Sequence, residues 1–198
     1  MKQIIFGLLF TLSWLGSNAQ SNLEIALQLD SMVKADQHWR NLLTKIRNSE
    51  VFSMDISTAQ KKVMETDSWN YLLLKDLVDE YGFLNPELVG NKGTHNFWLL
   101  VQHQDANPDF QKEVLQLMKA ELENNADLKM DYAYLLDRVN VTSGEKQVYG
   151  TQLTLNADSS SYIQKPLIEP EKLNERRKKM LLPPIEKYIA AMNERHYG

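Results

Sequence analysis

Apolar residues recur every three or four positions along most of the chain, which is the spacing that places side chains on one face of an α-helix. A first helix is predicted over about 22–48, with the stripe Met32, Ala35, Trp39, Leu42 and Ile46. A second helix is predicted from a cap at Ser57 or Thr58. It ends at about Tyr81, because Gly82 follows and glycine is a common helix stop.

Three further helices are predicted before the character of the chain changes. The third covers about 94–104 and is apolar all round, so we expect it to be central. Asn107 and Pro108 form a cap followed by a proline at the first helical position, which begins a fourth helix that runs to about Asn124. A fifth helix covers about 128–140.

Alternating residues around Gly150 then predict a small β-hairpin or irregular arm that closes near Ile163. Gly150 itself permits a bend or a close backbone approach. A proline pair splits the last stretch into two helices, about 170–181 and 184–196. The predicted fold class is mainly α, a single-domain, bundle-like helical fold with a small β-hairpin arm.

Residues 1–19 have the pattern of a signal peptide. Lys2 precedes an apolar run that ends at Leu15, and small residues follow up to Ala19. The run is shorter than the roughly 20 apolar residues that span a bilayer, and no later segment is a candidate. We therefore expect cleavage after Ala19, export to the periplasm or the medium, and a mature single domain over 20–198 without a transmembrane segment.

The composition narrows the classes of function. The chain has no cysteine, which excludes disulfides, thiol nucleophiles and thiolate metal sites. Its formal net charge of −4 argues against a nucleic-acid partner. The one basic cluster, 176–179, lies among glutamates and is interpreted as a solvated helix face. The oligomeric state is left open.

No metal or cofactor is predicted. His95 and His103 lie about 12 Å apart along a helix, which is too far to hold one ion. A phosphate-binding loop, a dinucleotide glycine fingerprint and a nucleophile elbow are all missing from the sequence.

Polar residues recur within or beside the apolar stripes and are the most informative feature of the chain. Such groups are costly to remove from water unless they meet partners or a ligand, so their recurrence predicts one shared interior site. The set comprises Asp36, Gln37, Arg40, Asp67, Asn70, Gln102, His103, Asp137, Arg138, Gln147, Tyr149, Thr151 and Gln152.

Two of these groups lie on the first two helices. Asp36 and Arg40 are spaced to form an ion pair with Gln37 beside it, and an ordinary surface ion pair is the alternative. Asp67 and Asn70 are likewise polar residues on an apolar face of the second helix. The alternative there is a hydrogen bond from Asp67 to a tyrosine of the core.

His103 follows the most hydrophobic run of the chain, so we expect it to be partly buried. Asp105 lies at or beyond the helix end and can turn back to orient the imidazole, an arrangement that suits a general base or a metal ligand. The alternative is a structural histidine that is held by hydrogen bonds.

Taken together, these fragments resemble an uncharacterised bacterial family, catalogued as a domain of unknown function. The motifs that carry the resemblance are Asp36-Gln37-x-x-Arg40, Asp67-x-x-Asn70, Gln102-His103-x-Asp105-x-x-Pro108-x-x-Gln111, Tyr134-Leu135-x-Asp137-Arg138-Val139 and Gln147-x-Tyr149-Gly150-Thr151-Gln152. The resemblance spans most of the mature chain. It implies a common fold and site but no activity.

Two classes of function fit this pattern. The leading hypothesis is an inter-helix polar pocket that binds a small polar or anionic ligand, with His-centred, hydrolase-like acid–base chemistry. His103 is then the proton acceptor, and Asp105 or Asp137 orients it. Arg40 and Arg138 hold an anion, and the other residues of the set bind the ligand. The competing class is a non-catalytic partner-binding or structural module of the cell envelope.

Overall fold

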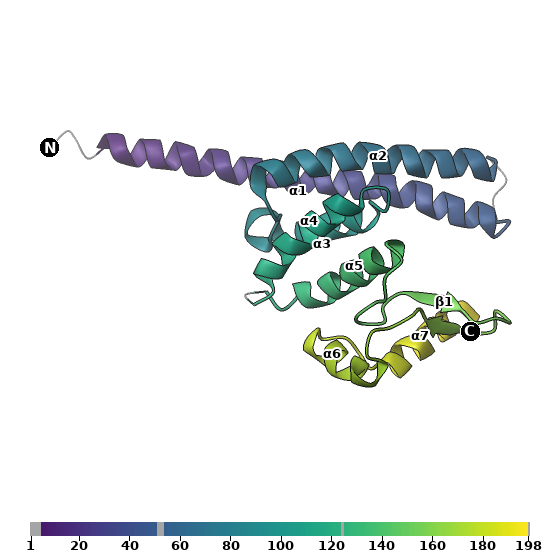
Figure 1. Cartoon of the computed structure of the whole chain (residues 1–198). Coiled ribbons are helices and arrows are strands. Elements are labelled where there is room, and N and C mark those ends of the chain that lie inside the picture. Colours follow the sequence, from purple (N-terminus) through teal and green to yellow (C-terminus); the bar gives the residue numbers. More distant parts are fainter. Residues whose placement is uncertain (1–4, 51–53, 124, 198) are drawn as a thin grey trace. The chain divides into compact units, whose positions relative to one another are not determined.

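A computed structural model describes residues 5–50, 54–123 and 125–197 of the chain; the side chains of 5–19, 21 and 197 are outside this description. The signal-peptide prediction for 1–19 therefore falls outside the residues whose side chains are described. Over the described residues the chain forms seven α-helices, a 3-10 turn and a two-stranded hairpin (Figure 1). The predicted mainly α fold with a small β-arm is confirmed.

The chain divides by its internal contacts into two compact units, Met1–His103 and Gln104–Gly198, and each is described by itself. Among the described residues, no helix combines the length and the apolar character needed to cross a membrane.

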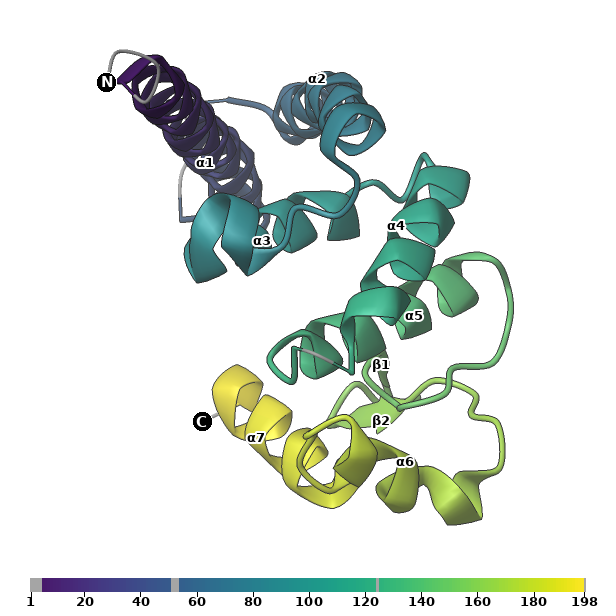
Figure 2. The same ribbon diagram turned by 90° about the vertical axis from the view of Figure 1, so that its left-hand side faces the viewer.

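The first unit consists of α1 (Ile5–Arg47), α2 (Ile56–Tyr81) and α3 (Pro86–Gln102). The helices α1 and α2 lie side by side, and α3 packs against both (Figures 1 and 2). The apolar stripes meet in a shared core, in which Leu29, Leu74 and Phe97 are fully buried. The periodicity of the sequence thus corresponds to the buried faces of these helices.

The start of α2 differs from the prediction, whereas its end agrees. The N-cap is Asp55 rather than Ser57 or Thr58, and its carboxylate accepts a hydrogen bond from the backbone N–H of Thr58 at 2.9 Å. At the other end, Gly82 has φ +71° and donates its N–H to the carbonyl of Val78. A carboxylate can accept hydrogen bonds from the free N–H groups at a helix start as well as a hydroxyl can. The spacing of the sequence therefore did not distinguish Asp55 from Ser57 or Thr58 as the N-cap.

The start of α3 was also predicted too late. The helix begins at Pro86 after an Asn85 cap, and Gly90 interrupts its helical geometry with φ +71° and ψ +163°. This kink breaks the regular spacing, so the periodic pattern becomes clear only beyond it. The apolar run that follows is central as predicted, because Phe97 and Val101 are fully buried.

The second unit begins with a helical pair, α4 and α5, and continues into the arm and the C-terminal helices. Its elements are α4 (Pro108–Glu121), α5 (Leu128–Thr142), β1 (Leu153–Leu155), β2 (Tyr162–Gln164), η1 (Pro170–Lys172), α6 (Leu173–Lys179) and α7 (Ile185–Tyr197). The strands are antiparallel, with Thr154 opposite Ile163, and α7 packs against β2 and α6. Pro108 begins α4 as predicted, although the Asn107 side chain makes no cap bond.

Gly150 provides the sharpest test of packing in the second unit. Its φ is +69°, and an added Cβ would lie 3.2 Å from Cδ1 of Ile185. We expect Gly150→Ala to lower the free energy of unfolding by about 1–2 kcal/mol for the backbone conformation alone, with a further loss from the close contact.

Gly144→Ala is the matched control, because Gly144 has φ +78° and no atom within 4 Å of an added Cβ. It should show the backbone cost alone. Urea denaturation followed by circular dichroism compares the two variants. Equal losses would contradict the close packing at Gly150.

Candidate functional site

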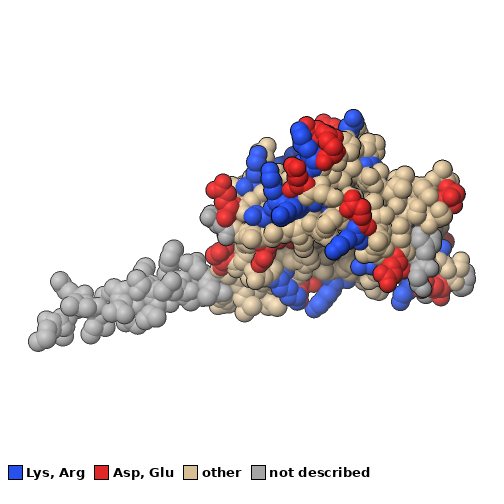
Figure 3. Space-filling model, turned by 90° about the horizontal axis from the view of Figure 1, so that it is seen from below, with Lys and Arg blue, Asp and Glu red and all other residues tan. Residues whose placement is uncertain are grey.

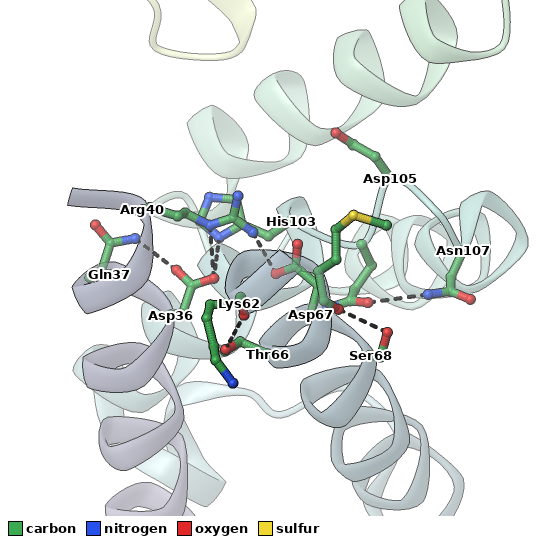
Figure 4. Close-up of polar contacts among 12 residues, drawn as sticks. Asp36, Gln37, Arg40, Lys62, Thr66, Asp67, Ser68, His103, Asp105 and Asn107 are labelled. Carbon is green, nitrogen blue, oxygen red and sulfur yellow. Dashed lines mark hydrogen bonds and ion pairs between the residues drawn. The ribbon is translucent and has the colours of Figure 1, made fainter. Parts of the chain in front are cut away.

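A buried carboxylate, that of Asp36 on α1, is the centre of the polar network in the first unit. Its residue is only 1% exposed. It accepts hydrogen bonds from Nε of Arg40 at 2.9 Å and from Nε2 of Gln37 at 2.9 Å, and its Oδ1 lies 3.0 Å from Nδ1 of His103. Figure 4 shows these side chains turned toward Asp36. Three donors thus surround one charge that has been removed from water.

Arg40 extends the network to a second helix. Its Nη2 lies 2.5 Å from Oδ1 of Asp67 on α2, while its Nε holds Asp36. His103 comes from a third helix, because it caps the C-terminus of α3. Arg40, Asp67 and His103 are each partly exposed, so solvent reaches the rim of the network but not Asp36.

The two carboxyls differ in how strongly their surroundings favour the charged form. Burial raises the pKa of Asp36, but the hydrogen bond from His103 and the charge of Arg40 outweigh it and hold that pKa below its usual range. For Asp67, burial is the largest effect and its pKa is raised; Arg40 opposes the rise, and the charge of Asp36 adds to it. Asp36 therefore stays ionised to a lower pH than Asp67.

The contact between Asp36 and His103 also determines the form of the neutral imidazole. An ionised carboxylate only accepts hydrogen bonds, so the hydrogen must be on Nδ1, which faces it at 3.0 Å. The lone pair is then on Nε2, as a proton acceptor requires. The prediction that Asp105 or Asp137 orients the ring stays a prediction, whereas Asp36 is the orienting group found in the first unit.

Asn70 contributes a buried donor to the same unit. Its residue is 4% exposed, and its Nδ2 has no hydrogen-bond partner among the residues that the structure describes. An unsatisfied buried donor costs on the order of 1–3 kcal/mol, so a water or a ligand group at this position would be stabilising. Gln102, also in the predicted set, is the last residue of α3 and is partly buried.

A groove between α1 and α2 opens beside the network. It has a volume of about 460 Å³ and is lined by Arg40, Leu43, Arg47, Gln60, Val63 and Met64. This volume is within the range of small-molecule sites. Arg40 belongs to both the network and the groove, and the Arg47 side chain forms no ion pair with any described residue.

In the second unit, Asp137 is fully buried and binds the backbone of the arm. Its carboxylate accepts the N–H groups of Val148 at 2.6 Å, Tyr149 at 3.0 Å and Thr151 at 2.9 Å, and the Thr151 hydroxyl at 3.0 Å. Burial raises the pKa of Asp137, and these four bonds oppose the rise. The carboxylate therefore shapes the turn around Gly150.

Gln147 fastens the same turn from within the arm. Its Nε2 donates to the carbonyls of Gln152 and Lys165 at 3.0 and 2.8 Å, and its Oε1 accepts the N–H of Gln152 at 2.9 Å. Asp137 thus binds Thr151 and the backbone of Tyr149, whereas Gln147 binds the backbone of Gln152 and Lys165, and we assign both sets of contacts a structural role. Ligand binding by this group stays a prediction.

Two arginines of α6 complete the arm and were missed by the sequence analysis. Arg177 is fully buried and donates to the carbonyls of Pro183 and Tyr149, both at 2.6 Å. Nε of Arg176 donates to the carbonyl of Val148 at 2.7 Å. The interpretation of 176–179 as a solvated face is therefore wrong for Arg177, whereas Arg176 is partly exposed and Lys178 and Lys179 are exposed. Lysines and arginines lie among acidic side chains on the face drawn in Figure 3.

Asp105 and Arg138 form a separate pair. The guanidinium binds both carboxylate oxygens, with distances of 2.7 and 2.6 Å, and both side chains are partly exposed. The structure thus brings Asp36, Gln37, Arg40, Asp67 and His103 together in the first unit, and it groups Asp137 with the arm in the second. A single site containing both groups stays a prediction. No cluster of three or more metal-binding side chains occurs among the described residues.

The fold and the network define a mainly α protein in which a buried Asp36 is bound by a partly exposed Arg40 and His103, with Asp67 on the far side of Arg40. The model of a family of unknown function (DUF6624) matches residues 23–198, so the chain belongs to this family. The resemblance to an uncharacterised family is thereby confirmed. No curated protein and no solved structure matches the chain. Function must therefore be inferred from the geometry.

The unequal surroundings of the two carboxyls give a direct test. On acidification, Asp67 should gain its proton at a higher pH than Asp36, because the pKa of Asp67 is raised and that of Asp36 is lowered. Carbon-detected NMR of the side-chain carboxyls measures both titrations, and Asp67→Asn assigns the signals. Asp36 titrating together with or above Asp67 would contradict the network.

Proposed function

We propose that the protein is an exported protein that binds a small polar or anionic ligand beside the network of the first unit, where His103 acts as a general base. The observation that carries the proposal is the His103–Asp36 contact, together with Arg40, which binds Asp36 and also lines the groove. A proton acceptor, a group that orients it and a nearby space for a ligand are the parts that acid–base catalysis requires.

The groove supports a ligand with a negative charge and some apolar surface. Arg47 supplies a positive charge that no described carboxylate balances, and Leu43 and Val63 supply buried apolar surface. Arg40 is less available, because both Asp36 and Asp67 bind it. The anion-binding role therefore belongs to Arg47 more than to Arg40.

A non-catalytic structural module is the second candidate, and a specific observation favours it. Asp36, Arg40 and Asp67 already satisfy one another within the chain. A network of this kind rigidifies a core without any ligand. The open groove is the feature that this candidate leaves unexplained.

His103→Gln separates the two candidates, because it keeps polarity and approximate size but removes proton transfer. If His103 is a general base, the variant should fold and lose about 10²–10⁴-fold of a catalysed rate. A structural histidine should instead cost on the order of 1–3 kcal/mol of stability, with no separate loss of function.

The measurement is thermal melting together with hydrolysis of a panel of p-nitrophenyl esters and phosphates, and NMR titration with acetate and inorganic phosphate. Arg47→Gln is the control for anion binding: it should weaken binding and leave the melting temperature unchanged. A destabilised His103→Gln protein with unaltered binding and unaltered activity per folded molecule would remove His103 from the site.

Export is part of the proposal and is tested on the native protein. We expect the mature chain to begin near Gln20, because Ser17 and Ala19 suit a signal peptidase. Mass spectrometry of protein purified from the native host reads the N-terminus. An intact N-terminus retained in the membrane would refute the expectation.

A further inference from the structure

Three large apolar side chains of α2 point away from the core of the first unit. Trp69 is 69% exposed, Leu72 53% and Leu73 38%. Their spacing of three and four residues places them on one face of the helix, while Asn70 and Leu74 lie on the buried face. Scattered single apolar residues are normal on surfaces, but a contiguous group that includes a tryptophan is typical of an interaction surface.

Charged residues on the same face have opposite signs at its two ends. Lys61 and Lys62 precede the apolar stripe by two turns, and Asp76, Asp79 and Glu80 follow it. Lys62 also binds Glu65 at 2.9 Å within the chain, and Lys75 binds Asp79. The face therefore carries a net positive charge before the stripe and a net negative charge beyond it.

This polarity is self-complementary when two copies of the helix run in opposite directions. A two-fold axis midway between Trp69 and Leu72 sets Trp69 of one copy opposite Leu72 of the other. The same axis sets Lys62 opposite Asp79 at both ends of the contact. We propose that a second copy of this chain docks on the Trp69–Leu72–Leu73 face of α2, antiparallel, to form a two-fold dimer.

The charges also argue against the main alternative occupant. An anionic lipid surface would be repelled by the three acidic residues at the end of the face. In the dimer, Glu65 faces Asp76 of the second copy once on each side of the axis, and Lys62 offsets each of these two like-charged contacts because it is bonded to Glu65. The surface therefore fits a second copy better than a membrane.

Sedimentation velocity of the full mature chain over a range of concentrations tests the proposal. The wild-type protein should pass from monomer to dimer, and Leu72→Lys should remain monomeric. Leu23→Lys is the matched control, because Leu23 is 60% exposed on α1 of the same unit but lies off the stripe. A wild-type protein that stays monomeric at all concentrations, or equal effects of the two substitutions, would overturn the proposal.

A charge exchange tests the antiparallel register. Lys62→Glu and Asp79→Lys should each weaken dimerisation, by up to about fivefold for each of the two symmetric pairs, and the double variant should restore it. Failure of the double variant to recover affinity would refute this register. Acrylamide quenching of Trp69 fluorescence adds a check, and Trp69→Phe identifies the signal of this residue. If Trp69 is shielded from acrylamide in the monomer, the same chain covers the stripe and the proposal is overturned.

Discussion

The removal of the Asp36 carboxylate from water is the constraint on which the first unit depends. A buried charge is tolerated only when donors replace the water that it has lost, and here those donors come from a guanidinium, an amide and an imidazole. Since Arg40 also reaches Asp67 on α2, and His103 ends α3, satisfying one carboxylate fixes three helices relative to one another. The network thus links the same three helices that the apolar core packs together.

Whereas in the first unit side chains bind one buried carboxylate, in the second unit charged side chains bind buried backbone groups. There the polar groups that need partners belong to the backbone of an irregular turn, which has no ladder to satisfy them. Asp137 accepts the N–H groups, while Arg176 and Arg177 bind the carbonyls. A short arm with few strand hydrogen bonds is thereby held in one conformation, and Gly150 provides the positive φ and the small volume that the turn requires.

The sequence predicted the helices well where one apolar stripe meets one core, as in α2 and α4, because amphipathic periodicity is a local signal. The prediction of helix bounds failed where a non-helical residue interrupts the apolar periodicity, as Gly90 does in α3. The sequence also identified His103 and Asp36 as polar residues in apolar surroundings, but not as partners, because 67 positions separate them. The burial of Arg177 was not predicted for a similar reason. The carbonyls that it binds belong to Pro183 and Tyr149, and the run of four basic residues contains no local signal that distinguishes Arg177 from its neighbours.

The balance of charge in the network bears on the choice between an enzyme and a scaffold. With a neutral imidazole, the network holds two carboxylates against a single guanidinium. A proton accepted at Nε2 of His103 would equalise the formal charges, and Nδ1 of the same ring lies 3.0 Å from Oδ1 of Asp36. A purely structural role would be served by a balanced pair such as Asp105 with Arg138. The excess carboxylate beside a partly exposed imidazole is the feature that supports the proposed proton-accepting site.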